Sequence, residues 1–295
     1  MKNAKLTWAV AALLLQAVSA TGLNPFIVGG TPAVIGQFPA HVGINVSPTV
    51  FCGGTILNSN HILTSGSCVL DGQNNLIAAN QMHVRAGVIT IDATTPATQV
   101  DRIFVHPHYN PFTFENDIAI LRTTTAFTFP ETAQPHIAPA ELNHRIVPEN
   151  DECHVAGWNW QAGIATTGLQ SLLVSIYPRA TCNQVFNGMI QSPMICTRTS
   201  AQNQALCVPN RGGGLYCGGK LSGIASFGFG CGANDTATVF TQIRYYEQWI
   251  NQQFGRTDNP PPGPTPMPGI GGATSMFNLS MVVILFATII IALVR

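Results

Sequence analysis

Charged side chains are scarce in this sequence. Asp, Glu, Lys and Arg make up 9% of the 295 residues, and the formal net charge is zero. Between Thr21 and Gly272, ten basic residues stand against thirteen acidic ones, which gives this part of the chain a net charge of −3. Such a body has no electrostatic attraction for nucleic acid or heparin. We therefore do not expect nucleic acid as a partner.

A long apolar run is also missing near the N-terminus. Residues 1–20 carry Lys2 and Lys5 near their start, continue with the mostly apolar stretch Leu6–Leu15, and end in the small residues Val18–Ala20. This order is typical of a secretory signal peptide, and the stretch is much shorter than the ~20 apolar residues of a membrane-spanning helix. We expect residues 1–20 to be cleaved and residues 21–26 to form a short N-terminal segment.

The sequence contains eight cysteines but no Cys-x-x-Cys pair. His154 lies beside Cys153, yet it has no second ligand pair at the spacing of a zinc site. An even number of cysteines behind a signal peptide indicates disulfides formed in an oxidising compartment. We expect a disulfide framework, with no metal and no cofactor.

The composition changes sharply after residue 254. Within residues 255–275, the stretch Asn259–Gly272 holds six prolines and four glycines, which predicts an extended stalk. Residues 276–295 form a hydrophobic tail that includes the 14-residue stretch Met281–Val294.

Two kinds of membrane attachment fit this tail. A GPI-attachment signal would place the lipid on Gly271 or Gly272, whereas a transmembrane helix would begin near Met276. Asn278 and Ser280 interrupt the helix, so the sequence favours the GPI anchor. We expect an extracellular protein that is held at the cell surface.

Short apolar or alternating runs, separated by Gly, Pro and Asn, predict β-strands along the body of the chain. The clearest runs are His41–Val46, Gly53–Leu57, Met82–Ile89, Ile118–Leu121, Leu172–Ile176 and Gly223–Ser226. Many short strands without helical periodicity between them indicate a barrel or a sandwich. Helical spacing appears only at Gln242–Phe254, so we expect an all-β body that ends in a helix.

Seven motifs follow one another in a fixed order. They begin with Ile-Val-Gly-Gly at Ile27, Cys-Gly-Gly-Thr at Cys52, Ile-Leu-Thr-Ser-Gly-Ser-Cys at Ile62, His-Pro-His-Tyr-Asn at His106, Asn-Asp-Ile-Ala-Ile-Leu at Asn116, Cys-His-Val-Ala-Gly-Trp at Cys153 and Ser-Phe-Gly-Phe-Gly-Cys-Gly at Ser226. Together they resemble the chymotrypsin/trypsin family of serine proteases.

The resemblance covers residues 27–254. It implies two six-stranded antiparallel β-barrels with an active cleft between them and a C-terminal helix. It also implies four disulfides, which are Cys52–Cys68, Cys153–Cys217, Cys182–Cys196 and Cys207–Cys231.

The family's catalytic triad is only partly present. The resemblance assigns the histidine position to Ser67, the aspartate position to Asp117 and the serine position to Arg211. A serine hydroxyl cannot act as a base near pH 7, and an arginine offers no nucleophile. Because Asp117 has no histidine to orient, we expect it to have a structural role, with hydrogen bonds to neighbours such as Ser226.

The oxyanion hole and the specificity pocket also depart from the family pattern. One oxyanion donor position is Pro209, which has no N–H, and the other is the backbone of Arg211. The pocket positions are Ala205, Gly228 and Thr238, of which Thr238 aligns with a wall position that is often glycine.

The activation signal is altered as well. In the family, cleavage before the first isoleucine frees an amino group that pairs with an aspartate. Here Phe26, which is not basic, precedes Ile27, and the neutral Asn210 stands at the aspartate position. We expect the Phe26–Ile27 bond to stay intact and Ile27 not to insert as a free N-terminus.

These departures predict a serine protease homologue that is not an enzyme. Its expected role is binding or regulation, including immune roles, with a protease inhibitor, a cascade protease or a microbial surface as partner. The alternative is a serine endopeptidase, as the family label would suggest. Asn45 and Asn234 lie in glycosylation sequons on expected loops.

Overall fold

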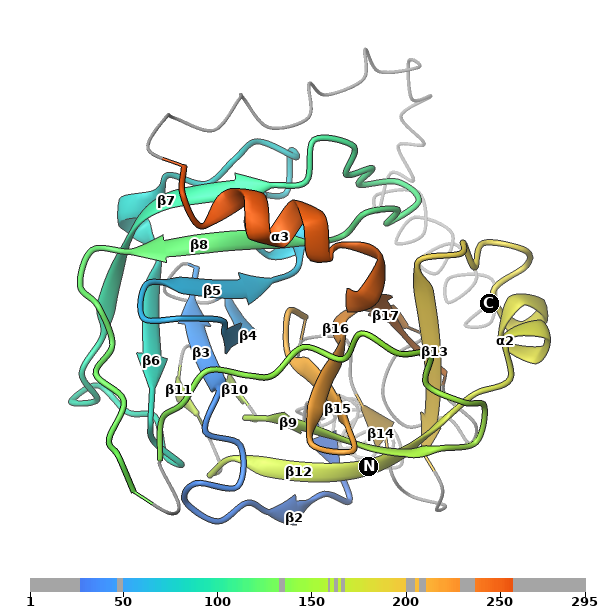
Figure 1. The fold of residues 1–295 in the computed structure, drawn as a ribbon, viewed down its shortest axis with the longest axis horizontal. Coiled ribbons are helices and arrows are strands. Elements are labelled where there is room, and N and C mark those ends of the chain that lie inside the picture. The colour runs from blue at the N-terminus through green and yellow to red at the C-terminus, as the bar shows by residue number, and fades with distance from the viewer. Residues whose placement is uncertain are drawn as a thin grey trace, which may run out of the picture. The chain divides into compact units, whose positions relative to one another are not determined.

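Two closed rings of antiparallel strands make up most of the secondary structure in the computed structural model (Figure 1). The structure describes residues 27–46, 50–132, 136–158, 160–161, 164–165, 168–199, 205–206, 211–228 and 237–256. The strands are β1 (Ile27–Val28), β2 (Thr31–Pro32), β3 (His41–Asn45), β4 (Phe51–Ile56), β5 (His61–Thr64), β6 (His83–Ala86), β7 (Thr98–Val105), β8 (Ala119–Thr123), β9 (Glu152–Gly157), β10 (Trp160–Gln161), β11 (Ile164–Ala165), β12 (Gln170–Ile176), β13 (Met194–Thr199), β14 (Ala205–Leu206), β15 (Gly214–Cys217), β16 (Lys220–Gly228) and β17 (Thr238–Gln242). The helices are α2 (Arg179–Val185) and α3 (Glu247–Gln253), with 3₁₀ turns η1 (Gly66–Cys68), η2 (Ala79–Gln81) and η4 (Ile243–Tyr245).

The first barrel has the strand order β3-β4-β5-β8-β7-β6, and β3 closes the ring by pairing with both β4 and β6. Its interior is filled by side chains that are fully buried, such as Val42, Ile44, Ile62 and Leu121. Because successive strand residues point to opposite faces, the alternating apolar runs of the sequence supply this core.

The second barrel has the strand order β13-β17-β16-β15-β9-β12, and it closes where β12 pairs with β13. Strand β2 extends this sheet by pairing with the start of β12. Its core includes Leu172, Leu215 and Phe240, together with Ile27 of β1, which pairs with β14. The prediction of two six-stranded antiparallel barrels is therefore confirmed.

Three of the four predicted disulfides are present. Cys52–Cys68 joins β4 to η1, Cys153–Cys217 joins β9 to β15, and Cys182–Cys196 joins α2 to β13. Each cross-link of this kind typically stabilises a fold by about 2–4 kcal/mol. Cys207 and Cys231 lie outside the described residues.

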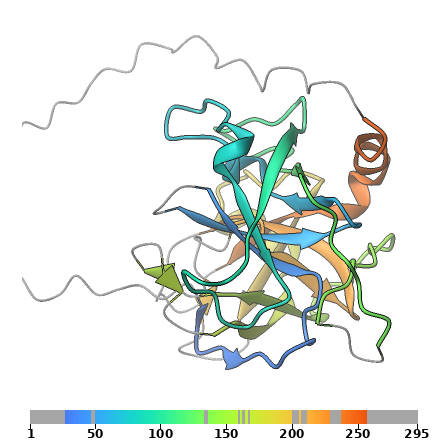
Figure 2. The same ribbon diagram turned by 90° about the vertical axis from the view of Figure 1, so that its left-hand side faces the viewer.

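A further apolar cluster connects the two barrels and the C-terminal helix. It includes Ile120 of β8, Ile224 of β16 and Ile250 of α3, all fully buried. Helix α3 lies on the outer side of the strands in two perpendicular views (Figures 1 and 2), and the ring of Phe254 that follows it contacts the His61 ring of β5, with centroids 5.2 Å apart. The helix thus holds the second barrel's C-terminal end against the first barrel.

The predicted terminal helix is shorter than Gln242–Phe254. Gln242 is the last residue of β17, pairs with Gly223 of β16, and donates its N–H to the Pro193 carbonyl at 2.8 Å. These bonds keep the backbone extended at Gln242, and the 3₁₀ turn η4 precedes α3. The predicted strand Met82–Ile89 is also shorter, because β6 spans only His83–Ala86 and Gly87 has a positive φ of 72°.

All described residues belong to one compact unit. Among the described residues, no helix has the length and hydropathy needed to cross a membrane. The predicted signal peptide, the hydrophobic tail and the stalk beyond residue 256 lie outside the described residues.

Candidate functional site

The carboxylate of Asp117 lies between the two barrels without solvent exposure. Oδ1 accepts the backbone N–H of Ser67 at 2.7 Å, and Oδ2 accepts the Ser67 hydroxyl at 3.1 Å. The Ser226 hydroxyl, from β16 of the second barrel, donates a short hydrogen bond to Oδ2. The backbone carbonyl of Asp117 accepts the Thr241 hydroxyl at 2.8 Å. One side chain therefore receives donors from both barrels, including the predicted neighbour Ser226.

Burial determines the protonation behaviour around Asp117. Desolvation raises the pKa of Asp117, while the hydrogen bonds from Ser226 and Ser67 and the positive charge of Arg211 oppose that rise. Burial and the nearby charge of Asp117 also raise the pKa of Tyr109, so its hydroxyl stays protonated. A Cβ atom at Gly66 would lie only 3.1 Å from the Tyr109 ring and 3.3 Å from Oδ1. The carboxylate is thus enclosed by closely packed groups.

No histidine contacts the Asp117 carboxylate, although all eight histidines lie within the described residues. His61, which is closest to Ser67 in sequence, bonds to Oδ1 of Asn58 through Nδ1 at 2.9 Å. Ser67 lies where the family histidine is expected, and its hydroxyl is 3.0 Å from the Ser65 hydroxyl. Serine hydroxyls therefore occupy the space beside Asp117.

Arg211 lies where the family's nucleophilic serine is expected, and its side chain is half-buried. The guanidinium carbon is 5.6 Å from the centroid of the Phe114 ring, which stacks on Phe227 with centroids 5.0 Å apart. The rings of Phe227 and Phe186 are in turn nearly perpendicular, with centroids 5.4 Å apart. Cation–π contact of this kind is worth about 0.5–1 kcal/mol at an exposed site and more where water is excluded.

The backbone at residues 211–213 is anchored to both barrels. The Arg211 carbonyl accepts the N–H of Gly53 at 2.8 Å, and the N–H of Gly212 bonds to the Ala225 carbonyl at 2.8 Å. Gly212 has a φ of 79°, and a Cβ there would lie 2.1 Å from Oγ1 of Thr64. Only glycine fits this close approach between barrels.

The predicted pocket positions meet at one end of the second barrel. Gly228 and Thr238 are cross-strand partners in β16 and β17, and Oγ1 of Thr238 donates to the Leu206 carbonyl at 3.5 Å. Leu206 follows Ala205 in β14. Thr238 is buried, so its side chain occupies part of the space between these strands.

Asn45 is not in a loop, contrary to the expectation for a glycosylation site. It ends strand β3 opposite Phe51 and His83, and its Oδ1 accepts a short hydrogen bond from Arg85. Glycosylation at Asn45 stays a prediction, since the sugar would join the other amide atom, Nδ2.

Several predicted positions lie outside the described residues. They are Phe26, Pro209, Asn210, Asn234, Gly271 and Gly272. Within the described residues, no group of three or more His, Cys, Asp or Glu side chains is placed to hold a metal ion.

The trypsin family model matches residues 27–250. The chain belongs to the trypsin family. It is 28% identical over 232 residues to a pig (Sus scrofa) protein named trypsin, covering 77% of this chain and 94% of the relative. It is 32% identical over 234 residues to trypsin Tyr p 3.0101 of Tyrophagus putrescentiae, covering 77% of this chain and 80% of the relative. A trypsin-2 of Salmo salar is 28% identical over 229 residues, which cover 76% of this chain and 93% of the relative.

Membership in the trypsin family explains why Ser67, Asp117 and Arg211 lie close together although they are far apart in the chain. The aromatic column of Phe114, Phe227 and Phe186 beneath Arg211 was not predicted from the sequence. Only Phe227 belongs to a family motif, and no spacing in the sequence links it to the other two rings.

Proposed function

We propose that this trypsin-family protein is non-catalytic and acts by binding. The observation that carries the proposal is the pairing of Ser67, rather than a histidine, with Asp117. Acyl transfer in this family needs an imidazole that removes the proton from the nucleophile and later returns it. A serine hydroxyl cannot do so near neutral pH.

The side chain of Arg211 supports the same proposal. Its guanidinium stays protonated and has no lone pair for attack on a carbonyl carbon. Its contact with the Phe114 ring and its positive charge near Asp117 indicate a structural role for this side chain. Pro209 would also remove one oxyanion donor, a loss of about 100- to 1,000-fold in rate.

The expected setting is extracellular. Disulfides in a trypsin-family domain are typical of secreted proteins. We propose that the hydrophobic tail directs attachment of a GPI anchor at Gly271 or Gly272 and that the Pro-rich stalk holds the domain away from the cell surface. A protease inhibitor, a protease of a cascade and a microbial surface are the proposed classes of partner.

A serine endopeptidase is the second candidate function, and membership in the trypsin family favours it. A fluorophosphonate probe distinguishes the two, because it labels only an activated serine nucleophile. We expect no labelling of the purified protein under conditions that label pig trypsin. Stoichiometric labelling, with the modified serine mapped by mass spectrometry, would overturn the proposal of lost catalysis.

The anchor has a separate test. Phosphatidylinositol-specific phospholipase C should release the protein from intact cells, because that enzyme cleaves the lipid from a GPI-linked chain. Retention after this treatment, combined with release by proteolysis of the stalk, would favour a transmembrane tail instead.

A further inference from the structure

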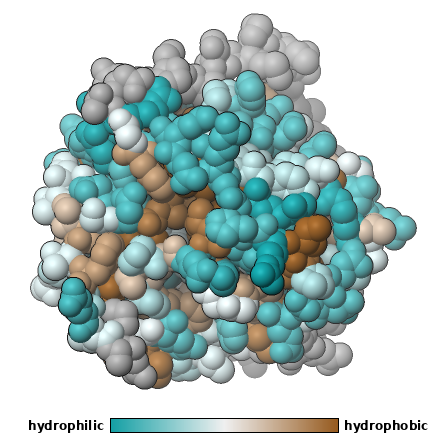
Figure 3. All heavy atoms as spheres, in the orientation of Figure 1, coloured by the Kyte–Doolittle hydropathy of each residue, from teal (hydrophilic) through white to brown (hydrophobic). Residues whose placement is uncertain are grey.

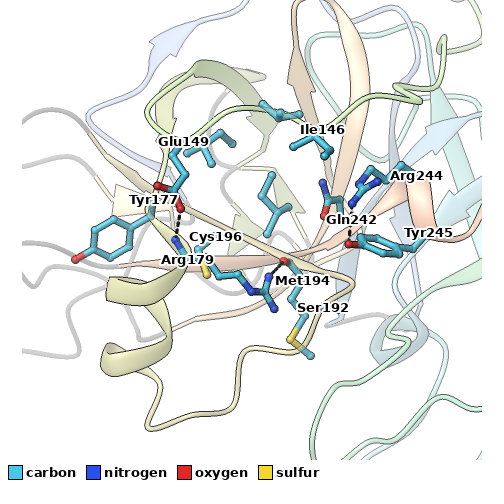
Figure 4. Close-up of a pocket in the computed structure, with 13 residues that line it drawn as sticks. Ile146, Glu149, Tyr177, Arg179, Ser192, Met194, Cys196, Gln242, Arg244 and Tyr245 are labelled. Atoms are coloured by element: carbon cyan, nitrogen blue, oxygen red, sulfur yellow. Dashed lines mark hydrogen bonds between the residues drawn. The ribbon is translucent and has the colours of Figure 1, made fainter.

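An open pocket of about 330 Å³ lies on the second barrel, between the end of β12, strand β13, and the turn η4. None of the triad, oxyanion or specificity-pocket positions lines it. Figure 4 shows Glu149 and Arg179 on one side of the pocket, and Arg244 with Tyr245 on the other. A volume of this size is within the range of pockets that accept a small ligand or a peptide side chain.

Apolar side chains form part of the pocket wall. Val147, Ile176 and Ile195 line it and are buried in the second barrel's core. Ile146, at its edge, keeps 69% of its surface exposed to solvent. In the orientation of Figure 1, the space-filling view shows a small hydrophobic patch in the region of β13, bordered by hydrophilic side chains (Figure 3). An apolar side chain of a ligand would therefore remove hydrophobic surface from water on both partners.

Two guanidinium groups at the pocket have no carboxylate partner among the described residues. Nη1 of Arg179 donates a hydrogen bond to the Met194 carbonyl at 3.0 Å, and Nη2 donates one to the Ile190 carbonyl at 3.1 Å. These bonds fix the position of the Arg179 guanidinium. Arg244 stacks on Tyr245, with its guanidinium carbon 4.3 Å from the ring centroid, and donates to the Tyr245 hydroxyl at 2.7 Å. Its Nε is buried, and no described residue forms a hydrogen bond with it. These contacts hold both positive charges in place before any ligand binds.

Glu149 provides a negative group at the same pocket. Its Oε1 accepts the backbone N–H of Arg179 at 2.9 Å, and the residue is exposed. A carboxylate here can accept an N–H from a peptide backbone, which a free inorganic anion does not offer. The pocket thus offers cations for a carboxylate, an acceptor for an amide and an apolar wall for a side chain.

We propose that this pocket binds an acidic peptide segment of a partner protein. One apolar side chain of the segment packs against Ile146 and Val147, while a neighbouring carboxylate accepts hydrogen bonds from Arg244 and Arg179. Glu149 accepts a backbone N–H of the same segment. The site is separate from the cleft, so this inference does not depend on the loss of catalysis.

Binding can be measured by fluorescence polarisation with the protein purified from expressing cells. The probe is an end-blocked, fluorescein-labelled peptide of sequence Glu-Glu-Leu-Glu-Glu. We expect saturable binding that weakens at least about tenfold with Arg244→Gln, as expected for loss of hydrogen bonds to a charged group. Arg145→Gln removes the same charge from an exposed residue that does not line the pocket, and it should leave the affinity within about twofold.

A second pair of variants tests the apolar part. Ile146→Asp should abolish binding, because it places a carboxylate beside the acidic probe. Val34→Asp makes the same change at a residue of similar exposure, 68%, elsewhere on the surface and should have little effect. Ile146 and Val34 are both exposed, so neither substitution should impair folding.

The outcomes decide the proposal. Replacing leucine by serine in the probe, or its glutamates by glutamine, should each weaken binding at least about tenfold. No binding of the acidic probe, equal losses in the control variants, or equal competition by inorganic phosphate at the same concentration would overturn it. Fluorophosphonate labelling is unaffected by any of these results, so the two proposals fail separately.

Discussion

Asp117 and His41 are both buried ionisable residues, but their surroundings are opposite. The Asp117 carboxylate receives three hydrogen bonds at the junction of the barrels. The His41 ring lies in β3, stacks on Trp158 with centroids 5.1 Å apart, and has no hydrogen-bond partner for either nitrogen among the described residues. Burial raises the pKa of Asp117 and lowers the pKa of His41 to about 4.

This contrast shows how the fold uses the two side chains. Asp117 connects elements that are distant in sequence, so the carboxylate has a structural use without any catalytic histidine. His41 acts as an apolar ring, because burial keeps it neutral and nothing bonds to its nitrogens. Residue type therefore does not reveal the role of a buried polar group; its hydrogen-bond partners do.

The largest loss of stability should come from filling the close approach between the barrels at Gly212. Gly212→Ala adds a Cβ 2.1 Å from Oγ1 of Thr64 and 2.4 Å from the Gly53 carbonyl, at a φ of 79°. We expect a loss of about 4 kcal/mol or more in the free energy of unfolding, from clash and backbone strain together. Urea unfolding of the purified protein measures this loss.

Gly218→Ala is the matched control. Gly218 has a φ of 57°, but its added Cβ meets nothing within 4 Å in the hairpin between β15 and β16. The cost there should be about 1 kcal/mol, from the left-handed backbone alone. Equal losses for the two variants would contradict the close approach between barrels.

Removing the carboxylate should have the next largest effect. Asp117→Ala leaves the N–H of Ser67 and two serine hydroxyls without their acceptor, so we expect a loss of about 3 kcal/mol. Asp117→Asn keeps an acceptor for Ser67 and should cost much less at pH 7.

The pH dependence sharpens this comparison. Because the pKa of Asp117 is raised on folding, its favourable contribution is present below the ordinary pKa of 3.8 and is lost as pH rises through the raised pKa. The Asn variant should therefore gain stability relative to the unmodified protein when the pH goes from 4 to 7. A structural role for Asp117 would be contradicted if the alanine variant unfolded at the same urea concentration as the unmodified protein.

His41→Phe should stabilise the protein by about 1–2 kcal/mol at pH 7, because it removes two buried nitrogens that have no partner and keeps a ring against Trp158. The pKa of His41 is lowered on folding, from 6.5 to about 4, so its contribution is present above pH 6.5 and is lost as pH falls toward 4. At pH 5 the advantage of the variant should therefore grow by about 2 kcal/mol.

Urea unfolding at pH 7 and pH 5 checks both parts of this prediction. His41→Gln is the control, because it keeps a buried polar group but cannot titrate. This variant should make the free energy of unfolding less dependent on pH, but it should not stabilise the protein at pH 7. An unchanged difference between the unmodified protein and His41→Phe at the two pH values would contradict the pKa of about 4.

The barrels were predictable because local signals and family motifs agree. In strands such as His41–Asn45, apolar residues alternate with other residues. The motifs at Cys52 and Cys153 allowed the cysteines to be matched to those of the family. The end of β17 at Gln242 was not predictable, because its extended backbone depends on pairing with the distant Gly223. Helix α2 was missed for a similar reason, since its seven residues carry a single buried side chain, Cys182.

The triad positions could be located from the sequence, but their contacts could not. The motifs located Ser67, Asp117 and Arg211, whereas the stacking of Arg211 on Phe114 depends on a loop before β8 that no motif describes. The pocket with Arg179 and Arg244 had no sequence signal, because its residues come from four separate stretches of chain.

Restoring the catalytic side chains should have the smallest effect, because we expect it to leave the protein without hydrolytic activity. Ser67→His with Arg211→Ser would rebuild the triad beside Asp117, yet we expect no measurable hydrolysis of small apolar ester substrates. Pro209 offers no N–H to the oxyanion, which costs about 100- to 1,000-fold in rate. Asn210 cannot pair with a freed amino group of Ile27, and no basic residue precedes that bond.

A variant that also carries Pro209→Gly, Asn210→Asp and Phe26→Arg tests this explanation after trypsin treatment, which would cleave before Ile27. It should be the first combination with measurable turnover, while the double variant serves as its matched control. Small esters are the appropriate substrates, because the buried Thr238 side chain takes up space at the predicted pocket positions, beside Gly228 and Leu206, and would exclude a large side chain. Vigorous turnover by the double variant alone would show that neither the missing oxyanion donor nor the missing carboxylate at Asn210 limits the reaction. In that case the loss of catalysis would depend on Ser67 and Arg211 only.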